Sequence, residues 1–182
     1  DFEFALPLIN ALQNEMEAAD DYIKKNAVIV HAEVAAEVFA DEEYDKYADF
    51  LDSIASNCDD LACYLPAINY YKRELSIKKN RNSHKSELAR ICNDIAIVYR
   101  KSADYSSALK MQNEALSFYS MVREHEYDYS YIVFDSIACT YHNMGDFSNS
   151  LAFFKKALSI KEKVLGKNNV SIDESFEELK NL

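Results

Sequence analysis

The chain of 182 residues is long enough for one or two domains with a sizeable hydrophobic core. Its 20 basic and 31 acidic side chains give a formal net charge of −11, which disfavours nucleic acid and anionic membranes as main partners because the average field repels both. Only 2 Gly and 2 Pro occur, whereas phosphate-binding loops, dinucleotide-binding motifs and turn-rich β-sandwiches need glycine, so the composition predicts a mostly helical protein.

A repeat of 41 or 42 residues runs along the chain. Four aromatic residues occupy one phase of it, namely Tyr22, Tyr64, Tyr105 and Phe147. The tetrapeptide Asp-Ser-Ile-Ala at 52–55 recurs intact at 135–138. Periods of this size are typical of solenoid proteins. The pattern predicts a single domain over 1–182, built of repeats at about 1–41, 42–82, 83–127 and 128–168, with a partial fifth repeat at 169–182.

Each repeat is predicted to form two helices. In the last full repeat, apolar residues recur at helical spacing over 134–141 and again over 151–158. Gly145 is expected to end the first helix in the left-handed conformation, and Asp146 to cap the second helix. Asp104 fills the same capping position one repeat earlier.

Small residues recur where the two helices of a pair must approach closely, at Ala55, Ala96, Ala108, Ala138 and Ala157. Tyr64, Tyr105 and Phe147 are expected to fill the wedge between neighbouring pairs.

A capping box at Ser171 and Glu174 predicts the start of another helix, so we expect the parent protein to continue beyond Leu182.

The last full repeat resembles a tetratricopeptide repeat. A small residue followed by Ile137 and Ala138, then Tyr141, Gly-Asp-Phe at 145–147 and Ala-Leu at 157–158 follow the pattern of that family. The period of 41 or 42 residues is similar to the length of the repeats of kinesin light chains. The resemblance implies an all-α fold, a right-handed α-solenoid of stacked antiparallel helix hairpins, with the first helix of every repeat on the concave side.

The inward-pointing positions of these first helices are the candidate binding residues. In the second repeat they are Asp49, Asp52, Ser53, Ser56, Asp59 and Asp60. In the third repeat they are Arg90, Asn93, Asp94, Ile97, Arg100 and Lys101. In the fourth repeat they are Ile132, Asp135, Ser136, Cys139, His142 and Asn143. The concave surface is therefore expected to be acidic at one end, basic in the middle and mixed polar at the other end.

An extended peptide or a partner helix is the ligand that the resemblance implies, since peptide-binding members of the family hold a ligand's backbone and charged ends at these positions. We expect its basic part near Asp52, Asp59 and Asp60, and an acidic group near Arg100 and Lys101. Each exposed charge contact contributes roughly 0.2–1 kcal/mol, so several must act together. A merely solvated inner face is the alternative.

Neither a metal nor another cofactor is expected. Cys139 and His142 stand three residues apart on one predicted helix, but no second pair completes a tetrahedral site. The chain has no nucleophile elbow, HExxH helix or phosphate loop, so we do not expect an enzyme. The four cysteines lack the spacing of a disulfide framework, which favours reduced thiols in the cytoplasm. The longest apolar stretch, 27–39, is too short to cross a bilayer.

The sequence therefore favours a non-catalytic module that binds a protein or peptide partner, does not bind nucleic acid or membrane, and belongs to a larger protein. Two alternatives stay open. One is a peptide-sensing regulatory domain that couples ligand binding to an attached effector domain. The other is a structural spacer. The oligomeric state is not predicted.

Overall fold

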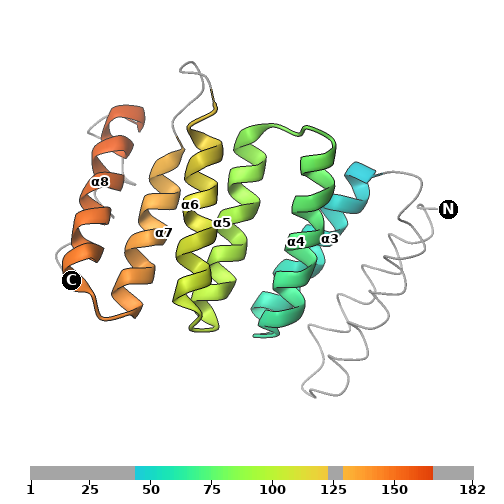
Figure 1. Cartoon of the computed structure of the whole chain (residues 1–182), viewed down its shortest axis with the longest axis horizontal. Helices are drawn as coiled ribbons and strands as arrows, with labels where there is room; N and C mark the ends of the chain where they lie inside the picture. Colours follow the sequence, from blue (N-terminus) through green and yellow to red (C-terminus); the bar gives the residue numbers. More distant parts are fainter. Residues whose placement is uncertain (1–43, 123–128, 166–182) are drawn as a thin grey trace. The chain divides into compact units, whose positions relative to one another are not determined.

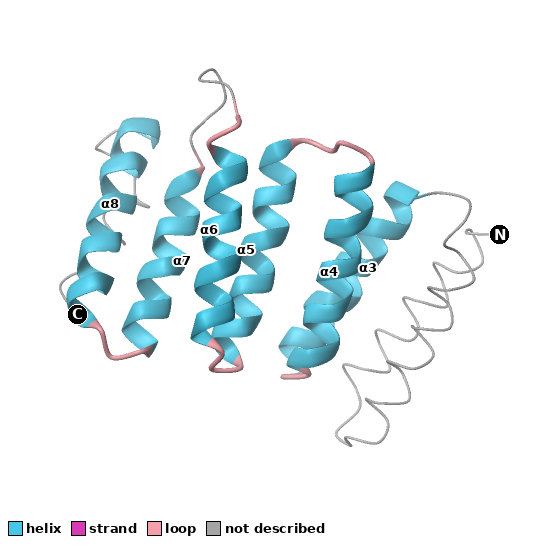
Figure 2. Ribbon diagram, in the orientation of Figure 1, coloured by secondary structure: helices cyan, strands magenta, loops and turns pink. Residues whose placement is uncertain are grey.

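The computed structural model describes residues 44–122 and 129–165, which form helices joined by short turns, with no strand among them (Figure 1; Figure 2). The chain divides into two compact units, Asp1–Asn80 (the N-terminal unit) and Arg81–Leu182 (the C-terminal unit). The described part of the N-terminal unit is one helix pair, and that of the C-terminal unit is two pairs.

Two of the predicted repeats are not part of this description. The first repeat, 1–41, and the partial fifth repeat, 169–182, lie outside the described residues. The three helix pairs that are described correspond to the predicted second, third and fourth repeats.

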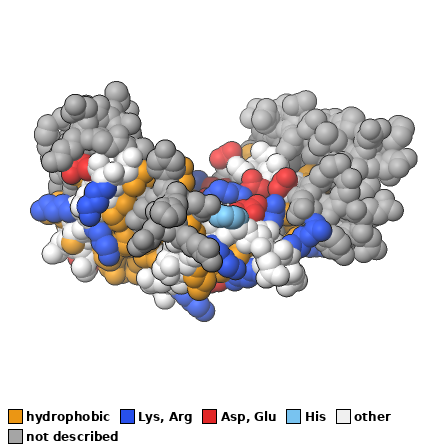
Figure 3. Space-filling view, turned by 90° about the horizontal axis from the view of Figure 1, so that it is seen from above, with side chains coloured by type: hydrophobic (Ala, Val, Ile, Leu, Met, Phe, Trp, Pro, Cys, Tyr) orange, Lys and Arg blue, Asp and Glu red, His pale blue; other side chains and the backbone are white. Residues whose placement is uncertain are grey.

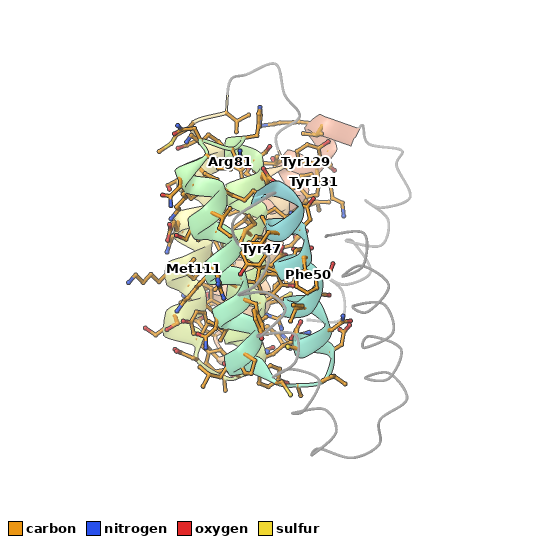
Figure 4. The ribbon with its side chains drawn as sticks, turned by 90° about the vertical axis from the view of Figure 1, so that its right-hand side faces the viewer. Tyr47, Phe50, Arg81, Met111, Tyr129 and Tyr131 are labelled. Carbon is orange, nitrogen blue, oxygen red and sulfur yellow. The ribbon has the colours of Figure 1, made fainter. Side chains whose placement is uncertain are left out.

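The N-terminal unit contains the pair formed by α3 (Tyr44–Asp60) and α4 (Tyr64–Asn80), which pack against each other. Its buried core is an apolar stripe at helical spacing, made of Tyr47, Ala48, Leu51, Ile54, Ala55 and Cys58 on α3 and of Ala67, Ile68, Tyr70, Tyr71 and Leu75 on α4. The Arg73 guanidinium lies 5.4 Å from the centre of the Tyr47 ring, a cation–π contact between the two helices; Figure 4 labels Tyr47 and its neighbour Phe50.

The C-terminal unit contains α5 (Lys85–Lys101), α6 (Tyr105–Tyr119), α7 (Ser130–Asn143) and α8 (Phe147–Leu165). Helix α5 packs against α6, and α7 packs against α8. The two pairs are joined because α7 also contacts both α6 and α5. The all-α fold of stacked hairpins that the sequence predicts is thereby confirmed.

The second helix of each described pair begins at the aromatic residue that marks the phase of the repeat, Tyr64, Tyr105 or Phe147. Tyr64 and Tyr105 are half-buried, but Phe147 is 56% exposed. The prediction that Phe147 fills a wedge between pairs is therefore wrong. The Phe147 ring meets the His142 ring edge to face, with the ring centroids 5.3 Å apart.

The turns inside the three pairs share one backbone conformation. A residue with positive φ follows the first helix in each of them, namely Ala62 at 57°, Ala103 at 62° and Gly145 at 79°. In the middle turn the amide of Asp104 donates to the carbonyl of Tyr99 at 2.9 Å, the long hydrogen bond of a Schellman motif. The left-handed end predicted at Gly145 is confirmed, and the same conformation strains the two alanines.

Aspartates cap the second helices of the C-terminal unit, as the sequence predicts. Asp104 accepts a hydrogen bond from the Ser107 amide at 3.0 Å, and Asp146 accepts one from the Asn149 amide at 3.1 Å. Hydrogen bonds from the side chain and then the backbone of Ser107 lower the pKa of Asp104. Hydrogen bonds from the backbone and then the side chain of Asn149 lower the pKa of Asp146. Both caps are therefore carboxylates at neutral pH.

Close packing inside each pair rests on positions that are wholly buried in all three pairs. These equivalent positions are Ala55, Ala96 and Ala138, then Ala67, Ala108 and Ser150, and finally Glu74, Ala115 and Ala157, all 0% exposed. A larger side chain at such a position overpacks the contact, which typically costs about 1–3 kcal/mol. Glu74 is the exception in size and charge, since alanine stands at its position in the other two pairs.

A polar bridge joins the two helix pairs of the C-terminal unit. The Gln112 side chain on α6 is fully buried, and its Nε2 donates to Ser136 Oγ and to Thr140 Oγ1 on α7, each at 2.9 Å. The Thr140 hydroxyl donates in turn to the Ser136 carbonyl at 3.0 Å. Aromatic residues, Tyr71 and Phe154, stand at the position of Gln112 in the other pairs. The bridge is thus particular to the α6–α7 contact and fixes its register.

Replacing the strained alanine in the middle turn, Ala103→Gly, should raise the free energy of unfolding by about 0.5–1 kcal/mol. Relief of the left-handed strain outweighs the extra entropy that glycine gives the unfolded chain. Chemical denaturation measures the change. The matched control is Gly145→Ala, which should destabilise by a similar amount through the backbone alone, because no atom lies within 4 Å of the added Cβ. A loss of stability in Ala103→Gly would contradict the turn assignment.

Replacing the bridging glutamine by a side chain of similar volume, Gln112→Met, should lower the free energy of unfolding by roughly 1–3 kcal/mol, because it removes two hydrogen bonds from buried hydroxyls. Combining it with Ser136→Ala and Thr140→Val should recover most of that loss, since no buried hydroxyl then lacks its partner. Denaturant titration of the variants tests this. If Gln112→Met alone is as stable as the parent, the bridge does not stabilise the interface.

Candidate functional site

Helix α5 carries a strip of surface side chains along one face. The strip consists of Arg90, Asp94, Ile97 and Lys101, at spacings of four, three and four residues, so that all four lie on one side of the helix. Arg90 and Lys101 are exposed, whereas Asp94 and Ile97 are half-buried. At about 1.5 Å rise per residue the strip is about 16 Å long.

Helix α7 carries a matching strip that consists of Ile132, Asp135, Cys139 and His142. Ile132 and His142 are exposed, and Asp135 and Cys139 are half-buried. Both helices begin at the upper end of the unit in Figure 1, and their backbones are in contact, so the two strips run alongside each other. We call them together the α5–α7 surface. Asn143, another predicted binding residue, is exposed at the end of α7.

Charge changes along the α5–α7 surface. Near the start of α5, Arg90 Nη1 lies 2.8 Å from Asp94 Oδ2 in an ion pair whose side chains are 46% and 26% exposed. Such a pair on a helix surface contributes only about 0.3–0.5 kcal/mol. At the other end of α5, Lys101 is exposed and Arg100 is half-buried, with an Nε donor that makes no hydrogen bond to a described residue. This end of the surface is therefore basic.

Helix α3 of the N-terminal unit carries an acidic strip. Its predicted binding residues are Asp49, Ser53, Ser56 and Asp60, all exposed, and Asp52 and Asp59, which are half-buried. The largely buried Lys78 side chain on α4 reaches Asp49, with Nζ 3.2 Å from Oδ1. This contact ties one carboxylate of the strip to the packing of the pair, although the Asp49 side chain stays 74% exposed.

Two of the predicted binding residues do not lie on the surface. Asn93 is 5% exposed, and Ser136 is 8% exposed. Ser136 accepts the hydrogen bond from Gln112 and so belongs to the packing of α6 on α7. Consecutive helical residues point about 100° apart, which turns each of them from the surface strip toward the packed side. We therefore leave Asn93 and Ser136 out of the candidate site.

Three tyrosines that the sequence did not single out extend the α5–α7 surface at the end where α7 begins. Tyr129 is 42% exposed, and Tyr119 and Tyr131 are half-buried. In Figure 3, hydrophobic side chains reach the surface over α7 and α8 beside Lys and Arg side chains.

No group of three or more His, Cys, Asp or Glu side chains in the described ranges could hold a metal ion. Cys58, Cys63, Cys92 and Cys139 are free thiols, the first and third of them buried. None of the helices in the described part of the chain has the length and apolar character needed to cross a membrane.

Comparison with protein families identifies residues 133–171 as a tetratricopeptide repeat. This segment contains most of α7 and all of α8. A search of curated protein sequences gives no match.

Solved structures with the same fold cover nearly the whole chain. BtubC (BKLC) from P. vanneervenii is 17% identical with a TM-score of 0.70, over 97% of this chain and 70% of that one. A putative kinesin light chain with nearly identical TPR-like repeats from Podosopora anserina is 11% identical with a TM-score of 0.65, over 95% and 84%. A Rap protein complexed with Competence and Sporulation Factor is 19% identical with a TM-score of 0.63, over 92% of this chain but only 50% of that one.

These likenesses agree with the helix pairs, the shared turns and the small residues at equivalent positions. The fold is an all-α solenoid of helix hairpins. Residues 133–171 match the tetratricopeptide repeat family, and the same kind of helix pair recurs through the described residues.

Proposed function

We propose that the chain is a non-catalytic module that binds an extended peptide, or an extended segment of a partner protein, on the α5–α7 surface. The observation that carries the proposal is the pair of parallel strips on helices in contact, with a basic end at Arg100 and Lys101. An acidic side chain or a terminal carboxylate of the ligand would lie at that end. The acidic strip of α3, which belongs to the N-terminal unit, would by itself attract a basic ligand.

The physical basis of the proposal is a rigid, mixed surface whose charges can act together. Each exposed charge contact contributes about 0.2–1 kcal/mol, so affinity requires several contacts and apolar area as well. Ile97 and Ile132 supply apolar area between the charged groups, with Ile132 42% exposed. Side chains that are fixed by packing lose little conformational entropy when a ligand binds.

A sensor role is the second candidate function. It is favoured by the likeness to the Rap protein, whose structure holds Competence and Sporulation Factor. This chain spans half of that protein's length, and as a sensor it would couple peptide binding to an attached effector domain. A sensor would gain thermal stability and become more compact with one short peptide, whereas a scaffold would retain a folded partner protein.

Charge reversal at the basic end tests the proposed function. The whole chain is first tested against an array of peptides to find those that bind. Each peptide has about nine residues and is about 30 Å long when extended. Arg100→Glu with Lys101→Glu should weaken binding of the acidic-residue peptides about tenfold or more, since two attractive contacts become repulsive. The double variant Asp59→Lys with Asp60→Lys should weaken the binding of peptides that carry basic residues.

The matched control is Lys110→Glu with Lys155→Glu, which makes the same change of net charge at exposed positions on α6 and α8. Its peptide affinities should stay within about twofold of the parent when measured by fluorescence anisotropy. Equal losses in both double variants would show a general charge effect. Unchanged affinity in Arg100→Glu with Lys101→Glu would refute the binding surface.

A further inference from the structure

A cluster of three tyrosines lies at the start of the α5–α7 surface. Tyr119 ends α6, Tyr129 directly precedes α7, and Tyr131 is in its first turn. The ring centroids of Tyr129 and Tyr131 are 6.4 Å apart with the planes tilted by 43°, and Figure 4 shows the two residues next to each other. Ile132, 42% exposed, follows directly in the chain. We call Tyr119, Tyr129 and Tyr131 the tyrosine cluster.

The carboxylates of Asp94 and Asp135 contribute to raised pKa values in this cluster. Burial raises the pKa of Tyr119, and the next largest cause is the negative charge of Asp94. Burial also raises the pKa of Tyr131, followed by the effects of Tyr129 and Asp135. The Arg90 side chain opposes the rise at Tyr119, but it ranks below Asp94. Tyr131 and Asp135 are four residues apart and so share one face of α7, and the Asp94 carboxylate on α5 is paired with Arg90.

Aromatic rings in this part of the chain already face ammonium groups. Lys161 Nζ lies 5.9 Å from the centre of the Tyr131 ring, and Lys85 Nζ lies 6.0 Å from that of Phe118. Both distances are within the range of cation–π attraction, which contributes about 0.5–1 kcal/mol at exposed sites and about 2 kcal/mol when desolvated. Lysine side chains of the chain itself therefore already contact aromatic rings here, and a cation of the ligand would compete with Lys161 for Tyr131.

We propose that the tyrosine cluster, with Asp94 and Asp135, forms a subsite for a basic side chain, Arg or Lys, of the bound peptide. This inference rests on the proposed function and adds to it the identity of a ligand residue. The apolar stem of the basic residue lies on Tyr129 and Ile132, and its cationic head faces the rings and the carboxylates. The chain's net charge of −11 favours the approach of a cation to this site.

The geometry of α5 also sets the position of the basic residue within the peptide. Asp94 and Lys101 are seven residues apart on the same face, which is about 10 Å along the helix. An extended peptide spans that distance in about three residues. The ligand should therefore carry a basic residue three positions away from the acidic group that meets Arg100 and Lys101. An apolar side chain is the competing occupant.

The experiment uses peptides with one glutamate held fixed and one variable position moved along the chain. The variable residue is Arg, Lys, citrulline as the neutral isostere of Arg, or norleucine as the apolar substitute. Arg and Lys three positions from the glutamate should bind about threefold to thirtyfold more tightly than citrulline or norleucine. Equal affinity for norleucine and Arg would overturn the cation subsite in favour of an apolar one.

Variants of the tyrosine cluster test whether its rings cause the preference for Arg and Lys in the peptide. Tyr129→Ala with Tyr131→Ala should abolish the preference for Arg and Lys over citrulline, whereas Tyr131→Phe should keep it because the ring face remains. Circular dichroism checks that the variants fold. If no peptide binds the unmodified chain, the proposed function fails and the subsite with it. If binding depends on Arg100 and Lys101 but the alanine variant keeps the Arg preference, the subsite alone is wrong.

Discussion

Close contact between neighbouring helices is the constraint on which each helix pair depends. Small residues such as Ala55, Ala96 and Ala138 are wholly buried at equivalent positions, so the two backbones of a pair can approach and bury apolar faces that neither helix could bury alone. Packing of this kind uses one side of the first helix. The opposite side stays at the surface, and on α5 and α7 it carries the charged and apolar strips that form the candidate site.

The contact between the two pairs of the C-terminal unit determines where these strips lie. Gln112 on α6 donates to Ser136 and Thr140 on α7, so a shift of one helix along the other would break two buried hydrogen bonds. This register holds the α7 strip beside the α5 strip. A surface fixed in this way needs little reorganisation to bind an extended ligand, which is the condition under which weak individual contacts can add up.

The repeat, the helix order and the caps could be predicted from the sequence because each depends on local spacing. Gly145 signals its left-handed turn, but Ala103 adopts the same conformation without any preference for it and is found only by alignment to Gly145. The site was predicted less well. An error of one residue in helical phase turns a side chain by about 100°, and this placed the buried Asn93 and Ser136 on the surface. Phe147 is 56% exposed although Tyr64 and Tyr105, at the equivalent positions, are half-buried.

Peptide binding on α5 and α7 would give both the charge pattern and the tyrosine cluster their function. Hydrogen–deuterium exchange of the whole chain, with and without a peptide selected from the array, tests it most directly. We expect slower exchange in segments 85–101 and 130–143 on binding, with α6 and α8 little changed. Slower exchange confined to α6 and α8, with α5 and α7 unaffected, would contradict it.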